Sequence, residues 1–169
     1  MTYVSPFGDM DTDHEWPRAL CLSRTHCSNA VEETLTEFYQ CAVAAIGAEP
    51  PCPQPAFFLA RHLAELSLKA LVGPVPKRFN HDLGKLLAHL QESGDDLFAG
   101  GEEQHLIVEF VRDLYARDPG GDEGRYATTK GGTPALATVC CANPLLFRRY
   151  IDLLFDYTQE RLNRVGQKV

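Results

Sequence analysis

No part of this 169-residue chain has the long apolar run of a membrane-spanning segment. A transmembrane helix needs about 20 consecutive, mostly apolar residues, and no window of the sequence comes near that length. Residues 1–15 hold four acids and no apolar core, unlike a secretory signal peptide. The sequence therefore predicts a cytoplasmic protein that makes no contact with a membrane.

The paired spacing of metal ligands is also missing. Structural zinc sites usually show C-x-x-C or H-x-x-x-H pairs, and the nearest group, Cys21, His26 and Cys27, does not match them. Without an export signal, the six cysteines are expected to be reduced thiols. We expect no metal and no cofactor. A Cys–His nucleophile pair stays open, because nothing places a base beside a given cysteine.

An excess of positive charge is lacking as well. The net charge is −7, although residues 144–169 hold five bases against three acids. The chain therefore has no uniformly basic nucleic-acid surface, while a local one on the last helix remains open. The stretch Lys130-Gly131-Gly132 lacks the G-x-x-x-x-G-K-[ST] order that binds nucleotide phosphates.

What the chain does have is apolar residues at helical spacing in five segments. The helices are expected over about residues 31–46 and 56–72, from 80–82 to before Gly94, over 102–116 and over 144–163. Residues 1–28 lack this periodicity and predict an irregular N-terminal arm. Residues 29–169 predict a single all-α domain. A long glycine-rich loop, 118–134, is expected before the last helix, and loops of that length are usually functional or disordered.

Short patterns in these segments resemble those of HEPN domains (higher eukaryotes and prokaryotes nucleotide-binding). Glu65 to Leu71 reads E-x-x-x-K-A-L, and His81 to Leu87 reads H-D-L-x-x-L-L. Gly124-Arg125-Tyr126, followed by Lys130-Gly131-Gly132, is similar to the R-Y … K-G segment of HEPN-like proteins from prokaryotic defence and mobile-element settings. The resemblance covers roughly residues 30–163. It implies an up-and-down helical bundle, a homodimer, and a defence or toxin–antitoxin-like setting with a partner protein encoded nearby.

Many members of that family are metal-independent ribonucleases whose signature is an arginine followed, after four to six residues, by a histidine near the last helices. This chain has no such pair, and its last histidine is His105. The resemblance therefore implies a non-catalytic module that binds RNA, nucleotide or a partner protein. The alternative is a divergent metal-independent ribonuclease that uses Glu65, Lys69, His81 and Arg125.

The candidate catalytic residues are Glu65, Lys69, His81 and Asp82. His81 and Asp82 form either a polar pair that acts on the ligand or a helix cap, with His81 bonded to neighbouring backbone. Glu65 and Lys69 either line the same pocket or form a surface ion pair of little energetic value.

The candidate ligand-binding residues are Arg125, Tyr126 and Lys130. Arginine can bind a phosphate with two hydrogen bonds, and tyrosine can stack on a base. The alternative is a loop held by packing of the Tyr126 ring on the bundle. Asp95 and Asp96 are expected to be solvated charges at a helix end.

Overall fold

The computed structural model describes residues 29–74, 79, 81–129, 131–137, 139 and 141–166. For residues 165 and 166 it describes the backbone alone. This part of the chain forms the helices α1 (Ala30–Ile46), α2 (Pro53–Val72), α3 (Leu83–Glu92), α4 (Asp96–Ala99), α5 (Glu102–Arg117) and α6 (Pro144–Gly166). The described residues form no strand, only an isolated bridge between Thr128 and Pro134. The prediction of an all-α fold is confirmed. None of the described helices has the length and apolarity needed to cross a membrane.

Two of the predicted helix starts are confirmed by their caps. The Asp82 Oδ1 atom accepts a hydrogen bond from the Lys85 backbone amide, 3.0 Å away, at the start of α3. At α6, the Asn143 side chain accepts from the amides of Leu145 and Leu146, and Pro144 is the first helical residue. Both caps satisfy amides that have no partner within their helix.

The α2 helix begins at Pro53, ahead of the predicted Ala56. Prolines fit the first turn of a helix, where their missing N–H is not needed. Pro53 and Pro55, which precede the expected start, therefore belong to the helix.

The short helix α4 was not predicted, since four residues are too few to show periodicity. Asp95 caps it by accepting from the Leu97 amide, 2.9 Å away. The same carboxylate accepts from Arg161 of α6, and Asp96 also binds Arg161. The expectation of solvated charges is wrong for Asp95, because its side chain is buried in this ion pair.

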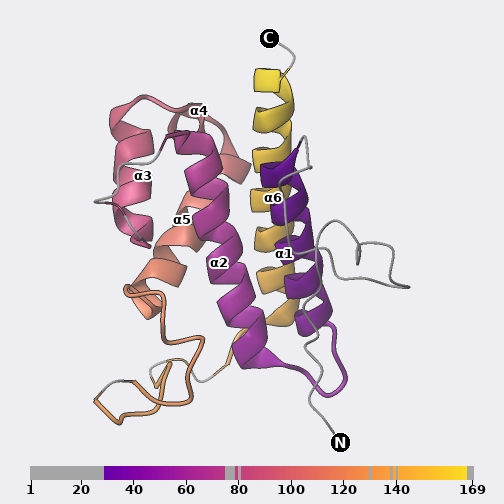
Figure 1. Cartoon of the computed structure of the whole chain (residues 1–169), viewed down its shortest axis with the longest axis vertical. Helices are drawn as coiled ribbons and strands as arrows, with labels where there is room; N and C mark the ends of the chain where they lie inside the picture. The colour runs from indigo at the N-terminus through magenta and orange to yellow at the C-terminus, as the bar shows by residue number, and fades with distance from the viewer. Residues whose placement is uncertain are drawn as a thin grey trace, which may run out of the picture. The chain divides into compact units, whose positions relative to one another are not determined.

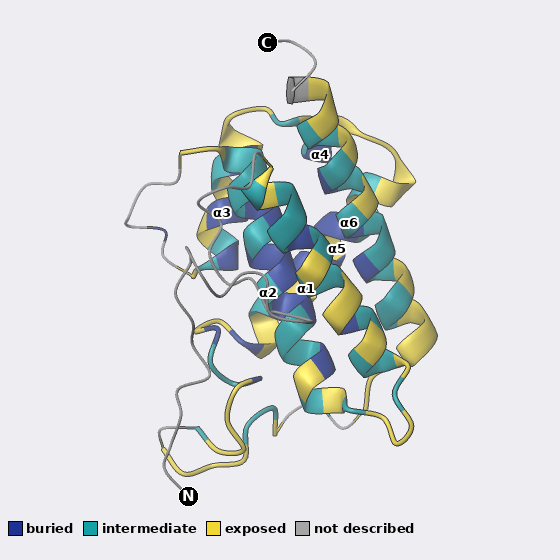
Figure 2. Ribbon diagram, turned by 45° about the vertical axis from the view of Figure 1, so that its right-hand side comes forward, coloured by how far each residue is buried: buried dark blue, intermediate teal, exposed yellow. Residues whose placement is uncertain are grey.

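The α2 helix lies in the middle of the fold (Figure 1), where it packs against α3, α5 and α6. The α1 helix contacts it through Phe38, whose ring lies 4.6 Å from that of His62. Because α2 has neighbours on several sides, most of its middle section is buried (Figure 2), including the charged residues Arg61 and Glu65.

The α6 helix carries apolar residues on several sides, and most of them pack within the chain. Ile151 and Leu154 are fully buried. Phe155 stacks on Tyr39 of α1 with the ring centroids 4.1 Å apart. Leu145 and Leu146 are the exceptions: they lie in the first turn and are 80% and 46% exposed.

Several predicted features lie outside the described residues. They are the N-terminal arm of residues 1–28, the group Cys21, His26 and Cys27, and the ligand-binding candidate Lys130.

Candidate ligand-binding site

Glu65 forms the centre of a polar cluster on α2. Its side chain is 1% exposed. Its Oε2 accepts from Arg61 Nη1 at 3.0 Å, and its Oε1 accepts from Lys69 Nζ at 2.6 Å. The same Oε1 lies 2.7 Å from Nδ1 of His81. The structure thus brings together Glu65, Lys69 and His81, three of the four catalytic candidates.

Arg61 completes this cluster and was not among the sequence candidates. It is 2% exposed, and it donates to two backbone carbonyls, that of Asp118 through Nε (3.2 Å) and that of His81 through Nη2 (2.7 Å). Nε also forms an ion pair with Oδ2 of the buried Asp118, at 3.4 Å. The i, i+4 spacing of Arg61 and Glu65 was visible in the sequence, but nothing there indicated that Asp118 would cover them.

Two opposing effects act on the pKa of Glu65. Burial alone would raise it, because a charged carboxylate loses hydration. Hydrogen bonds from Lys69 and His81, together with their charges, outweigh burial and hold the pKa below its ordinary value. Glu65 is therefore a buried, ionised carboxylate that can fix the His81 ring in place.

Two interpretations are alternatives to a site: a cap for His81 and a surface ion pair for Glu65 and Lys69. Neither fully describes these residues. The ring of His81 bonds to the Glu65 carboxylate, so the prediction that it binds neighbouring backbone is wrong. Lys69 and Glu65 do form an ion pair, but the carboxylate is buried. The His81 side chain is 46% exposed and that of Lys69 is partly exposed. The surface therefore presents the two basic groups, while the Glu65 carboxylate lies beneath them.

Asp82 is next to this cluster but has a structural role. Besides capping α3, it forms an ion pair with Lys85, with Oδ2 and Nζ 3.2 Å apart. Its interpretation as a helix cap is confirmed.

Arg125 and Tyr126 lie on the connection between α5 and α6, against the N-terminal half of α2. The Arg125 guanidinium lies over the Phe58 ring, 5.3 Å from its centroid. The Tyr126 carbonyl accepts from Gln54 Nε2 at 2.6 Å, whereas Tyr126 as a whole is 60% exposed. The prediction that the Tyr126 ring packs on the bundle is wrong. Arg125 anchors the connection instead, and the Tyr126 ring is left accessible.

The pKa of His62 responds to both groups of candidates, Lys69 with His81 and Arg125. Its ring lies between those of Phe38 and Phe58, and its Nδ1 makes no hydrogen bond within the described part of the chain. Burial lowers its pKa; the charges of Arg125, Lys69 and His81 lower it further, while Glu65 opposes them. His62 is therefore a neutral ring close to all three basic candidates.

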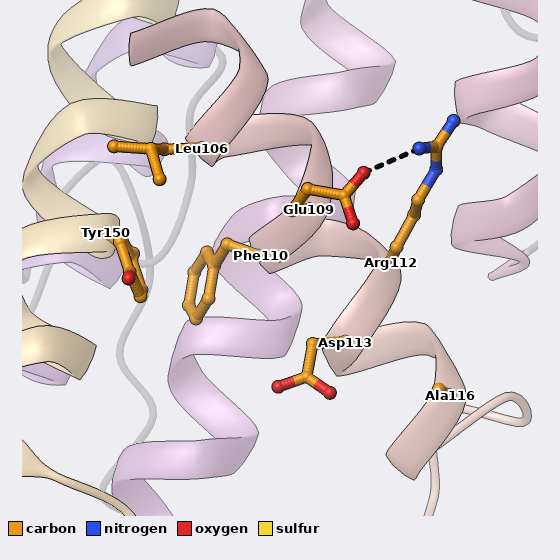
Figure 3. A pocket seen from close by; sticks show the side chains of 7 residues that line it. All are labelled: Leu106, Glu109, Phe110, Arg112, Asp113, Ala116 and Tyr150. Atoms are coloured by element: carbon orange, nitrogen blue, oxygen red, sulfur yellow. Dashed lines mark hydrogen bonds and ion pairs between the residues drawn. The ribbon is translucent and has the colours of Figure 1, made fainter. Parts of the chain in front are cut away.

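A groove of about 470 Å³ lies between α5 and α6, away from these residues (Figure 3). Leu106, Phe110 and Tyr150 provide its apolar lining, with Glu109 and Asp113 beside them. Both acids are paired within α5, Glu109 with Arg112 and Asp113 with Arg117.

No three His, Cys, Asp or Glu side chains in the described ranges are grouped so as to hold a metal ion. Comparison of the chain with protein-family models, with curated proteins and with solved structures found no match.

Proposed function

We propose that the chain is a non-catalytic module that binds RNA or a nucleotide. The binding residues are Lys69, His81, Arg125 and Tyr126, which together are called the basic surface. One observation carries this proposal: two basic groups that reach the surface, Lys69 and His81, cover the buried carboxylate of Glu65 in a chain whose net charge is −7. Cations at the surface attract phosphates, and the exposed Tyr126 ring offers a face on which a base can stack.

The layout of the basic surface supports a ligand with more than one phosphate. Arg125 lies over Phe58 of α2, and Lys69 lies further along the same helix. A rise of 1.5 Å per residue separates Phe58 from Lys69 by about 16 Å. This distance suits an extended strand with phosphates at both ends of the surface.

The resemblance to HEPN domains supports the same assignment. It also favours a cytoplasmic setting in a prokaryotic defence or toxin–antitoxin-like system. A partner protein encoded nearby is the alternative ligand that the resemblance implies.

Fluorescence anisotropy with a labelled single-stranded RNA, and competition by ADP, test the proposal. Arg125→Ala should weaken binding, whereas Arg112→Ala, an exposed arginine paired with Glu109 on α5, should not. Tyr126→Ala should weaken binding and Tyr126→Phe should preserve it. Two to three phosphate contacts predict a slope of log affinity against log salt of about −1.4 to −2. Absence of binding by the wild type to both probes would refute the proposal.

A second candidate, a metal-independent ribonuclease, is favoured by the Glu65–His81 pair. A carboxylate bonded to one nitrogen of an exposed imidazole leaves the other nitrogen to act as a general base. His81 would take the proton of a 2′-hydroxyl, whose oxygen attacks phosphorus. The bond from phosphorus to the 5′-oxygen then breaks, and Lys69 gives that oxygen a proton. Cleavage of RNA in EDTA by the wild type, lost in His81→Ala, would select this candidate.

We also propose that the chain forms a homodimer through the start of α6. Leu145 and Leu146 are exposed there, and Leu146 lies one turn from Tyr150, which lines the groove of Figure 3. A second copy would cover these side chains and the apolar part of the groove.

A further inference from the structure

Arg61 joins two segments that are distant in the sequence. Its Nη2 donates to the carbonyl of His81, and its Nε donates to the carbonyl of Asp118. Both acceptors are backbone atoms. One guanidinium therefore fixes main-chain positions on two sides of α2, as well as pairing with the Glu65 side chain.

The chain at Gly121 fits closely against the same guanidinium. Gly121 has a φ of +74°, and a Cβ built there would lie 2.8 Å from Cζ of Arg61. A Cβ atom makes no contact this short, so the Arg61 guanidinium or the chain at Gly121 would have to shift, and a positive φ strains any residue with a Cβ. The backbone of the α5–α6 connection thus lies directly on Arg61.

Hydrogen bonds connect Asp118, which contacts Arg61, with Asp122 and then with Arg125. The Asp122 amide donates to Oδ1 of Asp118 at 3.0 Å, and the Arg125 amide donates to the carbonyl of Asp122 at 3.1 Å. At Gly124, an added Cβ would lie 3.0 Å from Cα of Phe58. The connection is therefore held against α2 from Asp118 to Arg125.

We propose that Arg61 is a positioning residue that couples the two halves of the basic surface, His81 on one side and Arg125 with Tyr126 on the other. Displacement of the connection at Gly121 moves Arg61, and with it the His81 carbonyl and the Glu65 carboxylate that holds the His81 ring. Only the ligand-dependent part of this inference rests on the proposed function.

The spectroscopic test needs no ligand. Gly121→Ala is compared with Gly132→Ala, a matched control in the same connection with a φ of +79° and no atom within 4 Å of an added Cβ. In ¹H–¹⁵N spectra, Gly121→Ala should shift the Asp82 amide and the His81 ring resonances. Gly132→Ala should shift only its own turn. Unchanged His81 and Asp82 resonances in Gly121→Ala, or equal shifts in both variants, would overturn the coupling.

Arg61→Lys separates coupling through the guanidinium from direct contact. Lysine keeps the positive charge, but its single nitrogen lacks the planar fork that reaches two carbonyls. If Arg61 transmits the effect, adding Gly121→Ala to Arg61→Lys should no longer shift His81. A shift of the original size in that background would overturn the inference. Should Arg61→Lys fail to fold, the two glycine variants still decide whether the connection at Gly121 and His81 are coupled.

A double-mutant cycle on binding of the labelled single-stranded RNA extends the test to the ligand. The loss in affinity of His81→Ala with Arg125→Ala should differ at least about twofold from the product of the single losses. In the Arg61→Lys background the losses should multiply. Simple multiplication in the wild-type background would contradict the coupling. Absence of RNA binding would instead refute the proposed function, and the spectra would still decide the role of Arg61.

Discussion

Nδ1 of His81 and Nζ of Lys69 both form hydrogen bonds with the same oxygen, Oε1 of Glu65, at distances of 2.7 and 2.6 Å. The carboxylate is buried, whereas both nitrogen-bearing side chains reach the surface. The charge of Glu65 thus controls the position of two exposed groups, and its loss should be felt in stability as well as in binding.

Replacing Glu65 by glutamine should make stability less dependent on pH. The folded-state pKa of Glu65 is lowered, so its ionised form contributes stability above the ordinary value of 4.5, and this contribution is lost as pH falls through the folded pKa. At neutral pH, Glu65→Gln should cost on the order of 3 kcal/mol, because Arg61 loses a buried partner. Urea unfolding from neutral to acidic pH measures both effects. A wild-type advantage that stays constant on acidification would contradict this prediction.

Asp82 should affect stability and leave binding unchanged. Loss of an N-cap usually costs about 1 kcal/mol, and asparagine caps nearly as well as aspartate. Asp82→Ala should therefore lower the free energy of unfolding by about that amount, and Asp82→Asn should lower it by less. Chemical denaturation and RNA anisotropy should be measured on both variants. A large loss of binding in Asp82→Asn would assign Asp82 to the ligand site.

Tyr157 should be among the last tyrosines to ionise. Burial, followed by the nearby charge of Asp95, raises its pKa to about 12. Since the folded pKa is raised, the stability that Tyr157 contributes is complete below its ordinary value of 10.0 and is lost as pH rises through the folded pKa. Alkaline titration of tyrosine absorbance should show a late step that Tyr157→Phe removes. The step should remain in a Tyr126→Phe control, whose ring lies elsewhere.

The proposed homodimer should depend on the first turn of α6. Wild type should scatter light as a species of twice 18.8 kDa at micromolar concentration, and Leu145→Glu with Leu146→Glu should give the monomer. Val31→Glu is the control, since Val31 is another exposed apolar residue, on α1. A wild-type monomer would exclude the dimer at that concentration. Dissociation by Val31→Glu alone would move the interface to α1.

The sequence predicted the five longer helices because each shows apolar periodicity over ten residues or more. It did not predict which faces of α2 are buried. Leu59 and Leu66, which fit the apolar spacing of this segment, are only partly buried, whereas Ala60, Ala64 and Leu68 are fully buried. Periodicity identifies one apolar stripe, but a central helix has neighbours on several sides, and those neighbours come from tertiary contacts.

The sequence likewise predicted part of the candidate site but missed other residues of it. The spacing of Glu65 and Lys69, and the short motif at His81, indicated polar residues that could meet. Arg61 had the same spacing to Glu65, yet its role depends on Asp118, which lies 57 residues further along the chain. Gly121 appeared as one glycine among several, and only the packed structure shows that a guanidinium occupies the place of its side chain.

The packing of α2 against α6 also has a consequence for synthesis. One side of α2 is covered by α6, which is synthesised after the other helices of this fold. Until α6 emerges, the nascent chain carries a central helix with part of its apolar surface uncovered, a condition that favours aggregation and chaperone capture. The core around α2 is therefore completed only after α6 has left the ribosome, however early the first helices form.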